Sequence, residues 1–115
     1  MKRIPGSDRL LAIWNPISNY QTRRLEKPAG DRTPLVGAIG TGTTDATWAP
    51  AFLVDRNDAE HEGYCYTAIH FTGKSVLLAY CAGGKADRNR RNRLNRLRIR
   101  KIDLDALPVA ADYGK

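Results

Sequence analysis

The side chains in this sequence that could do chemistry gather in two adjacent runs, Gly63–Phe71 and Ser75–Gly84. Together these runs contain three tyrosines, two cysteines and one histidine. A phenol can act as a nucleophile when a neighbouring base removes its proton, and two facing thiols can form a disulfide. On strands, however, tyrosines more often pack or stack, and cysteines more often remain buried thiols. To choose between these interpretations, we need the secondary-structure elements that position these side chains.

Those elements are predicted to be the two strands of a β-hairpin. Both runs are rich in β-branched and aromatic residues, and Gly73 marks a turn between them. With the turn centred on Gly73, Cys65 is expected to face Cys81. By the same register, Tyr66 is expected to face Tyr80. Alternation along the strand adds further residues to the face of Tyr66, namely Tyr64, Ala68 and His70.

The rest of the chain alternates short strand-like runs with turns. Further strands are expected at residues 9–15, 34–40, 51–55 and 97–100. A helix over 91–102 is the alternative for the last of these, but Leu97 and Ile99 alternate with arginines, which favours a strand. Several short strands with Gly-rich turns are typical of an all-β sandwich, barrel or propeller. The long polar loop at 15–33 is of a length that is usually functional.

Composition indicates one globular domain in 115 residues, with an uneven charge. The net charge is +7, and the segment from Lys85 to Lys101 holds nine basic residues and one acid, so the basicity belongs to one segment. There is no apolar run of about 18 residues to predict a transmembrane helix. No leader is visible at the N-terminus, which favours a cytoplasmic location only weakly and leaves the compartment open.

Four segments, in their order along the chain, resemble the C-terminal part of the sialidase (neuraminidase) β-propeller superfamily, in particular bacterial proteins with BNR repeats. Leu10–Asn15 resembles the strand before the family's third active-site arginine, and Arg32–Ile39 resembles that arginine and its following strand. Gly63–Thr67 is similar to the segment that holds the nucleophilic tyrosine. Leu94–Arg100 resembles a strand of the last blade. The turn Gly40–Trp48 is similar to a degraded Asp-box.

The resemblance implies roles for two residues. Arg32 matches the arginine that binds the substrate carboxylate, a task suited to the planar, permanently charged guanidinium. Tyr66 matches the nucleophile, and a neutral phenol avoids the repulsion that a carboxylate nucleophile would meet beside an acidic sugar. No residues of this sequence match the family's acid/base aspartate, its first two arginines or its tyrosine-activating glutamate. The chain alone is therefore expected to be inactive.

The resemblance also implies a fold. It predicts an all-β structure of antiparallel blades of a sialidase-type β-propeller, with about one and three-quarter blades in a single partial domain, 1–115. Residues 1–55 would form the penultimate blade and 63–107 the last. Open blades leave strand edges and apolar faces unpaired, so self-association or docking on upstream blades is expected. Trp14 and Trp48 are expected in the blade core.

The expected function is that of the C-terminal part of a sialidase-like glycoside hydrolase that acts on terminal acidic sugars. Its partner would be an acidic glycan or sialoside, with no cofactor and no membrane. Two alternatives stay open, a noncatalytic oligomeric glycan-binding module and a basic nucleic-acid-binding protein. The run Arg88–Arg93 would carry the latter, but it lacks interleaved aromatic residues, so nucleic acid is the weaker partner.

No metal site is expected from the two histidines. Neither His61 nor His70 is paired with a cysteine at a metal-ligand spacing. His61 lies between two glutamates and is expected in a solvated loop. His70 is expected to be packed on its strand.

Overall fold

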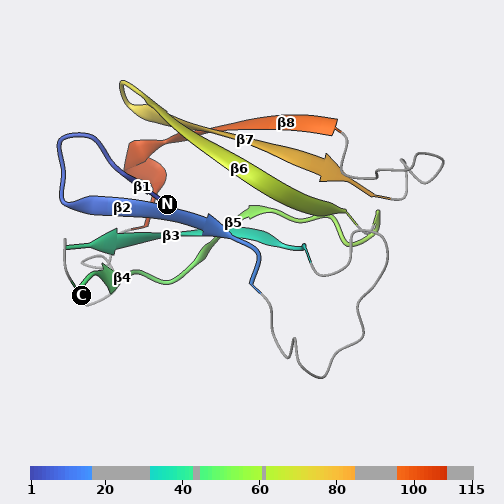
Figure 1. Ribbon diagram of the computed structural model, residues 1–115, viewed down its shortest axis with the longest axis horizontal. Coiled ribbons are helices and arrows are strands. Elements are labelled where there is room, and N and C mark those ends of the chain that lie inside the picture. Colours follow the sequence, from blue (N-terminus) through green and yellow to red (C-terminus); the bar gives the residue numbers. More distant parts are fainter. Residues whose placement is uncertain (17–31, 43–44, 61, 85–95, 109–115) are drawn as a thin grey trace.

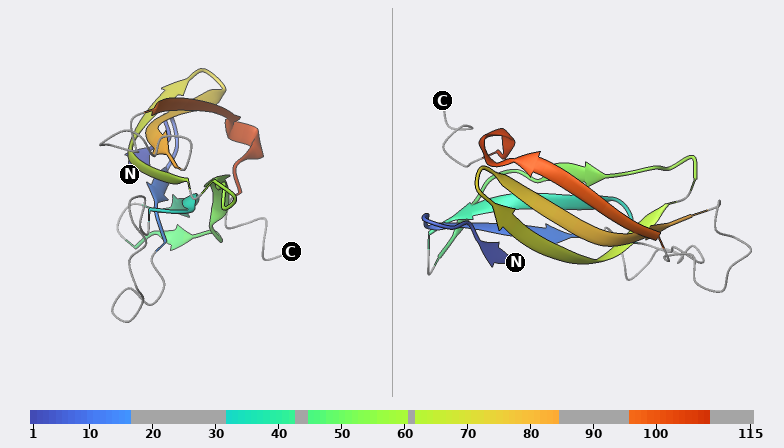
Figure 2. Two further views of the ribbon diagram at one scale, coloured as in Figure 1. Left: turned by 90° about the vertical axis from the view of Figure 1, so that its right-hand side faces the viewer. Right: turned by 90° about the horizontal axis from the view of Figure 1, so that it is seen from above.

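The strand-forming runs pair into two antiparallel sheets that face each other (Figures 1 and 2). The computed structural model describes residues 1–16, 32–42, 45–60, 62–84 and 96–108. Within these residues, the regular structure is β-strand apart from one 3-10 turn, η2, at Leu104–Ala106. The predicted all-β class with antiparallel strands is therefore confirmed. The described residues include no helix long and apolar enough to cross a membrane.

The first sheet comes from the N-terminal half of the chain. Its strands are β1 (Lys2–Arg3), β2 (Arg9–Trp14), β3 (Leu35–Thr41), β4 (Thr47–Trp48) and β5 (Phe52–Asp55). β2 pairs with β1 on one side and with β3 on the other, and β3 pairs with both β4 and β5 along successive parts of its length. β3 is an almost unbroken apolar run, which suits its central position in the sheet.

The second sheet has the order β6-β7-β8, with β7 in the centre. Its strands are β6 (Gly63–Thr72), β7 (Ser75–Gly83) and β8 (Arg96–Asp103). The strand predicted at 97–100 is confirmed as β8, and the helical alternative is wrong. Pairing with β7 decides the outcome, since every residue of β8 has a partner on that strand.

The β6–β7 hairpin confirms the predicted pairing of the cysteines. Cys65 lies opposite Cys81. The register then shifts by one residue, so that Ala68 pairs with Ala79, and the hairpin closes on a two-residue loop, Gly73-Lys74. The shift is a β-bulge, in which one strand carries an extra residue.

The bulge overturns the other predicted pair. Tyr66 does not face Tyr80 across the ladder, because Tyr66 lies within the bulge where the pairing is interrupted. It also overturns the predicted shared face of Tyr64 and Tyr66. Tyr64 is fully buried, whereas Tyr66 is 81% exposed, because the extra residue reverses the alternation of side chains.

The core lies between the two sheets. Leu11, Leu35, Ile39 and Val54 project from the first sheet, and Tyr64, Val76, Leu78 and Tyr80 project from the second. Ile4, which follows β1, and Leu107, which follows η2, complete the core. Burying each large apolar side chain contributes about 1.5–3 kcal/mol before the entropy of ordering is subtracted, so this shared layer is what joins the two sheets.

Each sheet exposes large apolar side chains on its outer face. On the second sheet, Leu97 is 72% exposed and Ile99 is 60% exposed. On the first sheet, Trp14 and Trp48 are 40% and 42% exposed. The prediction that both tryptophans lie in a core is therefore wrong for this chain, because alternation turns them away from the opposite sheet.

Candidate functional site

Tyr66 is presented to solvent by the bulge in β6. Its φ angle is +56°, in the left-handed region that residues other than glycine rarely adopt. Such a conformation costs on the order of 1–3 kcal/mol and persists where the surroundings impose it, often at functional positions. Bulges commonly redirect a side chain next to a site. The phenol of Tyr66 therefore points into solvent from a fixed position in β6.

Arg32 is placed beside this point by its backbone. The Arg32 carbonyl accepts a hydrogen bond from the Tyr64 amide at 2.8 Å. It accepts another from Nδ2 of Asn15 at 3.0 Å, and the same amide nitrogen donates to the Pro34 carbonyl at 3.1 Å. Asn15 thus ties the end of β2 to the residues that precede β3, and the Arg32 carbonyl ties the same residues to the start of β6.

The side chains of Arg32 and Tyr66 meet. The guanidinium carbon of Arg32 lies 5.8 Å from the centroid of the Tyr66 ring, within the range of a cation–π contact. Both side chains are exposed. Interaction with the side chains of Cys65 and Tyr66 raises the pKa of Arg32, so its charge is retained. The two residues singled out by the sequence are therefore brought together, 34 positions apart in the chain, into one accessible pair.

Cys65 is the third member of this group. Burial raises the pKa of its thiol, and the adjacent Arg32 guanidinium acts in the opposite direction. Cys81 lies opposite it, and both cysteines are free thiols. Arg32 therefore contacts a phenol and a thiol at the same end of the second sheet.

Two buried carboxylates lie near this end of the sheet but serve another purpose. Asp55 accepts hydrogen bonds from the Tyr80 hydroxyl at 2.6 Å and from Arg98 at 2.8 Å. Glu62 is bound by Arg98 and, at 3.3 Å, by Arg96. Burial by itself would raise the pKa of Asp55, but its bonds with Tyr80 and Arg98 bring that pKa below its usual value.

The two carboxylates are bound by Tyr80, Arg96 and Arg98. Within the described residues, neither Asp55 nor Glu62 makes a hydrogen bond with the Tyr66 hydroxyl. The Tyr64 hydroxyl, by contrast, is buried without a hydrogen bond, and burial with the nearby Glu62 and Asp55 raises the pKa of this phenol. Tyr64 is therefore a neutral core residue, and Tyr66 is the accessible phenol.

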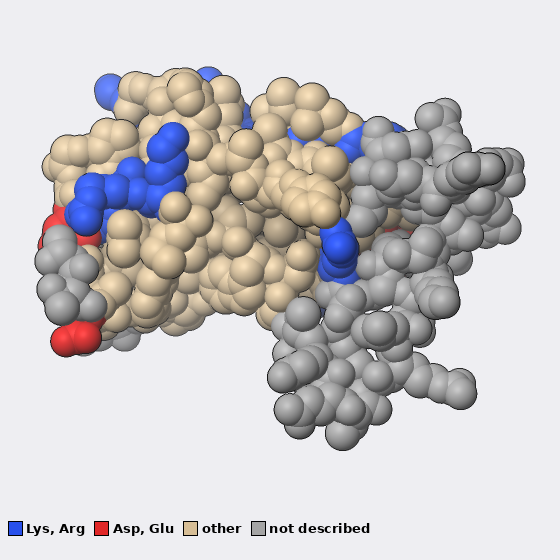
Figure 3. Space-filling model, in the orientation of Figure 1, with Lys and Arg blue, Asp and Glu red and all other residues tan. Residues whose placement is uncertain are grey.

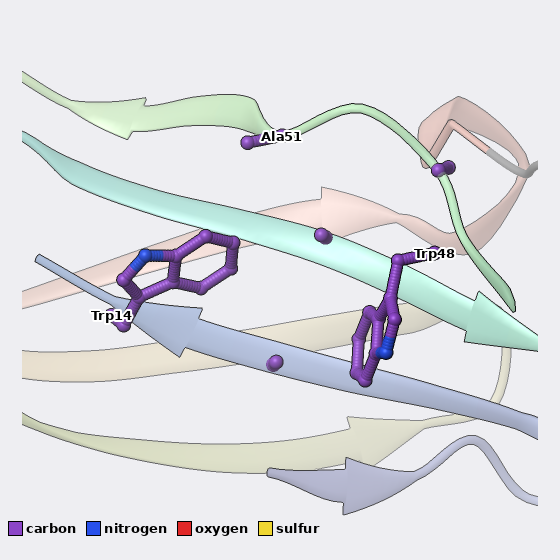
Figure 4. A pocket seen from close by; sticks show the side chains of 6 residues that line it. Trp14, Trp48 and Ala51 are labelled. Carbon is purple, nitrogen blue, oxygen red and sulfur yellow. The ribbon is translucent and has the colours of Figure 1, made fainter. Parts of the chain in front are cut away.

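A separate hollow lies on the outer face of the first sheet (Figure 4). Its volume is about 430 Å³. Trp14 and Trp48 stand on either side of a floor of small residues, Ala12, Ala38, Ala49 and Ala51. The Trp48 ring lies directly over Gly40, where an added Cβ would be 3.0 Å from the ring. The hollow is lined mostly by apolar atoms, so it is distinct from the charged pair at Arg32 and Tyr66.

One face of the molecule shows how its charged side chains are distributed. On the face shown in Figure 3, Lys and Arg side chains form separate groups rather than one continuous basic area. The run Arg88–Arg93 and His61 lie outside the described residues, so the predictions about them remain predictions. His70 was expected to be packed on its strand, and this is wrong, because it lies exposed on the outer face of β6.

The sequence did not indicate Asn15 or the cluster around Arg98 as site elements. Asn15 follows a strand and precedes a long loop, which is a position where a side-chain amide often binds loop carbonyls, and this was the available signal. Arg98 alternates with apolar residues on β8, a pattern that usually predicts a solvent-facing charge, so its inward position carried no signal in the sequence.

Comparison of the chain with models of protein families, with curated proteins and with solved structures finds no match.

Proposed function

We propose that this chain supplies the arginine and tyrosine of a glycoside hydrolase site that acts on terminal acidic sugars, as the C-terminal part of a sialidase-like protein. The observation that carries the proposal is the contact of the Arg32 guanidinium with the Tyr66 ring at 5.8 Å, on an exposed bulge. The sequence resemblance selected these two residues independently of their position in space.

The chemistry of the pair fits a sugar whose carboxylate adjoins the anomeric carbon. Arg32 would bind the carboxylate through its planar set of donors. The Tyr66 phenol would then stand beside the anomeric carbon without the repulsion that a carboxylate nucleophile would meet there. To act as a nucleophile, the phenol needs a base, and departure of the alcohol needs an acid. Those groups would come from a neighbouring copy or from further blades of a longer polypeptide.

The arrangement of the sheets supports a propeller as the finer description of the fold. We propose that the sheet within 1–55 is the penultimate blade and the sheet within 63–107 the last blade. In a propeller, blades pack face to face around an axis, so a pair of adjacent blades has an apolar face on each outer side. The exposed Trp14 and Trp48 on one side and Leu97 and Ile99 on the other agree with this arrangement.

The binding half of the proposal can be tested on the chain itself. N-acetylneuraminic acid is titrated into isotopically labelled protein, and the signals of arginine side chains and tyrosine rings are followed by NMR. With one arginine holding the carboxylate, we expect a dissociation constant on the order of 1 mM or weaker. Arg32→Gln should abolish the shifts of the Tyr66 ring. Arg56→Gln is the matched control, because Arg56 is an exposed arginine that pairs with Asp58 in another loop.

Neutral methyl galactoside serves as the control ligand. Equal shifts with both sugars, or unchanged binding by Arg32→Gln, would contradict a carboxylate-binding role for Arg32.

The noncatalytic glycan-binding module is the second candidate function. The observation in its favour is that no carboxylate of the described residues hydrogen-bonds to Tyr66. The two functions differ in what Tyr66→Phe does to the complete protein or assembly. The change should abolish turnover by a hydrolase, whereas a binding module should retain its affinity within a few fold.

A further inference from the structure

The two cysteines form a pair on the outer face of the second sheet, next to the bulge that carries Tyr66. Cys65 on β6 lies directly opposite Cys81 on β7, and both are free thiols. Directly opposite residues on antiparallel strands have Cα atoms about 4.5–5.5 Å apart. A disulfide spans Cα separations of about 4.4–6.8 Å. The pairing therefore places the two Cα atoms at a separation that a disulfide can span.

The two thiols differ in their surroundings. Cys81 is half-buried and can be reached from solvent, whereas Cys65 is buried. Cys65 in turn lies beside the Arg32 guanidinium, which favours its thiolate form against the effect of burial. An external reagent should therefore meet Cys81 first, and Cys65 is suited to react next with whatever is bound to Cys81.

We propose that Cys65 and Cys81 are a redox modification site, a dithiol that glutathione disulfide or a similar low-molecular-weight disulfide converts reversibly into an intramolecular disulfide. The Cys81 thiolate attacks one sulfur of the reagent, its S–S bond breaks, and one glutathione thiolate leaves. The Cys65 thiolate then attacks the Cys81 sulfur of the mixed disulfide, and the second glutathione thiolate leaves. The protein loses two electrons and two protons, which convert the reagent into two thiols.

The bond would join β6 to β7 beside the bulge and would remove the thiol that Arg32 contacts. This proposal goes beyond the acidic-sugar site and does not depend on it, because the cysteines would react whether or not Arg32 binds a carboxylate. A failure to bind sugar and a failure to form the disulfide are separate results.

The experiment is the mass of the folded chain after incubation in glutathione redox buffers and acid quenching. The wild-type chain should lose the mass of two hydrogens, carry no glutathione, and regain its mass with dithiothreitol. Cys65→Ser should accumulate one glutathione on Cys81. Cys81→Ser should react at least about tenfold more slowly than Cys65→Ser, because its remaining thiol is buried. Circular dichroism of each variant establishes that it is folded.

The role of Arg32 is tested by the rate of the second step. In Arg32→Gln, the mixed disulfide on Cys81 should persist several-fold longer, whereas the control Arg56→Gln should close as fast as the wild type. Equal closure rates would overturn the role of Arg32. A stable glutathione adduct on the wild-type chain, disulfide-linked dimers in place of the internal bond, or a bond that forms only in urea would overturn the proposal as a whole.

Discussion

At the residue scale, Arg32 is held beside Tyr66 by main-chain contacts rather than by its side chain alone. The Arg32 carbonyl is bound by the Tyr64 amide and by the Asn15 side chain. The Tyr64 amide is two residues from Tyr66, so the same short stretch of β6 fixes both partners of the contact. Displacing the Arg32 backbone would therefore move the guanidinium relative to the ring.

Asn15 is predicted to be a positioning residue for this contact. Asn15→Asp replaces the donor Nδ2 with an acceptor, which cannot bind the carbonyls of Arg32 and Pro34 and is repelled by them. We expect a loss of about 1 kcal/mol of stability, since the two bonds are partly exposed. We also expect the Tyr66 ring signals to move toward those of Arg32→Gln in NMR spectra.

The matched control is Asn57→Asp, an exposed asparagine in the loop after β5. It should leave the Tyr66 signals in place. Unchanged Tyr66 signals in Asn15→Asp would remove Asn15 from the site even if stability fell.

At the element scale, Arg98 connects the two sheets through their carboxylates. It extends from β8 to Asp55 at the end of β5 and to Glu62 just before β6. The interactions with both acids raise the pKa of Arg98, so it remains charged. One guanidinium thus bridges two buried acids where the chain passes from one sheet to the other, and Arg96 adds a second positive charge at Glu62.

Replacing this guanidinium should be strongly destabilising. Arg98→Met keeps much of the apolar stem but leaves Asp55 and Glu62 buried without their shared cation. Removing one partner of a buried ion pair costs about 3–5 kcal/mol, and the partial exposure of Arg98 places the expected loss near the lower figure. Urea unfolding measures it, with Arg56→Met as the exposed control. A loss below about 1 kcal/mol would contradict a structural role for the cluster.

Stability should also fall at alkaline pH through Tyr80. Burial, with the hydrogen bond to Asp55 and its charge, raises the pKa of Tyr80 to about 12, from about 10 in an unfolded chain. Because the folded-state pKa is the higher one, the stabilisation is complete below about pH 10 and is lost as pH rises through about 12.

Thermal unfolding should show this decline in stability at alkaline pH, and Tyr80→Phe should make the decline shallower. Tyr66→Phe is the control, since that ring is exposed. An equal fall of stability with pH in the wild type and in Tyr80→Phe would contradict this role of Tyr80.

The elements of the second sheet could be predicted from sequence because their cues are local. Strand-forming residues on both sides of Gly73 define the hairpin, and the alternation of Leu97 and Ile99 with arginines defines β8. The pairing of Cys65 with Cys81 followed from counting outward from the turn. The loop turned out to be Gly73-Lys74 rather than a turn centred on Gly73. This loop shifts the pairing next to it by one residue from the predicted register. The bulge shifts the pairing back by one residue, so Cys65 faces Cys81 as predicted.

The bulge itself could not be predicted from those cues. The sequence of β6 continues to alternate, and nothing in the residue types of Tyr66 and its neighbours marks an extra residue. Its position depends on contacts from elsewhere, among them the bond between the Tyr64 amide and the Arg32 carbonyl. For the same reason, the resemblance could identify Arg32 and Tyr66, but their contact depends on tertiary structure.

At the scale of the whole molecule, the two sheets leave apolar surface on opposite sides. One side presents Trp14, Trp48 and Leu53, and the other presents Leu97 and Ile99. Because these faces differ and point in opposite directions, contact between them is heterologous, and it either closes into a ring or continues as a chain. Large exposed apolar faces usually mark interaction sites. The same faces would meet neighbouring blades if the chain is part of a larger propeller.

The last prediction is that the chain in monomeric form does not hydrolyse sialosides at a useful rate. It offers Arg32 and Tyr66, but no described carboxylate is bonded to the Tyr66 phenol. General acid and base assistance are each worth about 10²–10⁴-fold, and a single arginine orients the substrate poorly. Release of a fluorogenic aglycone from a sialoside is measured for the wild type and Tyr66→Phe over a range of protein concentrations, with the mass in solution determined at each. Rates equal to the buffer rate are expected wherever the chain is monomeric. Turnover by the monomer that Tyr66→Phe abolishes would contradict the prediction, whereas turnover that appears with assembly would show that a second copy completes the site.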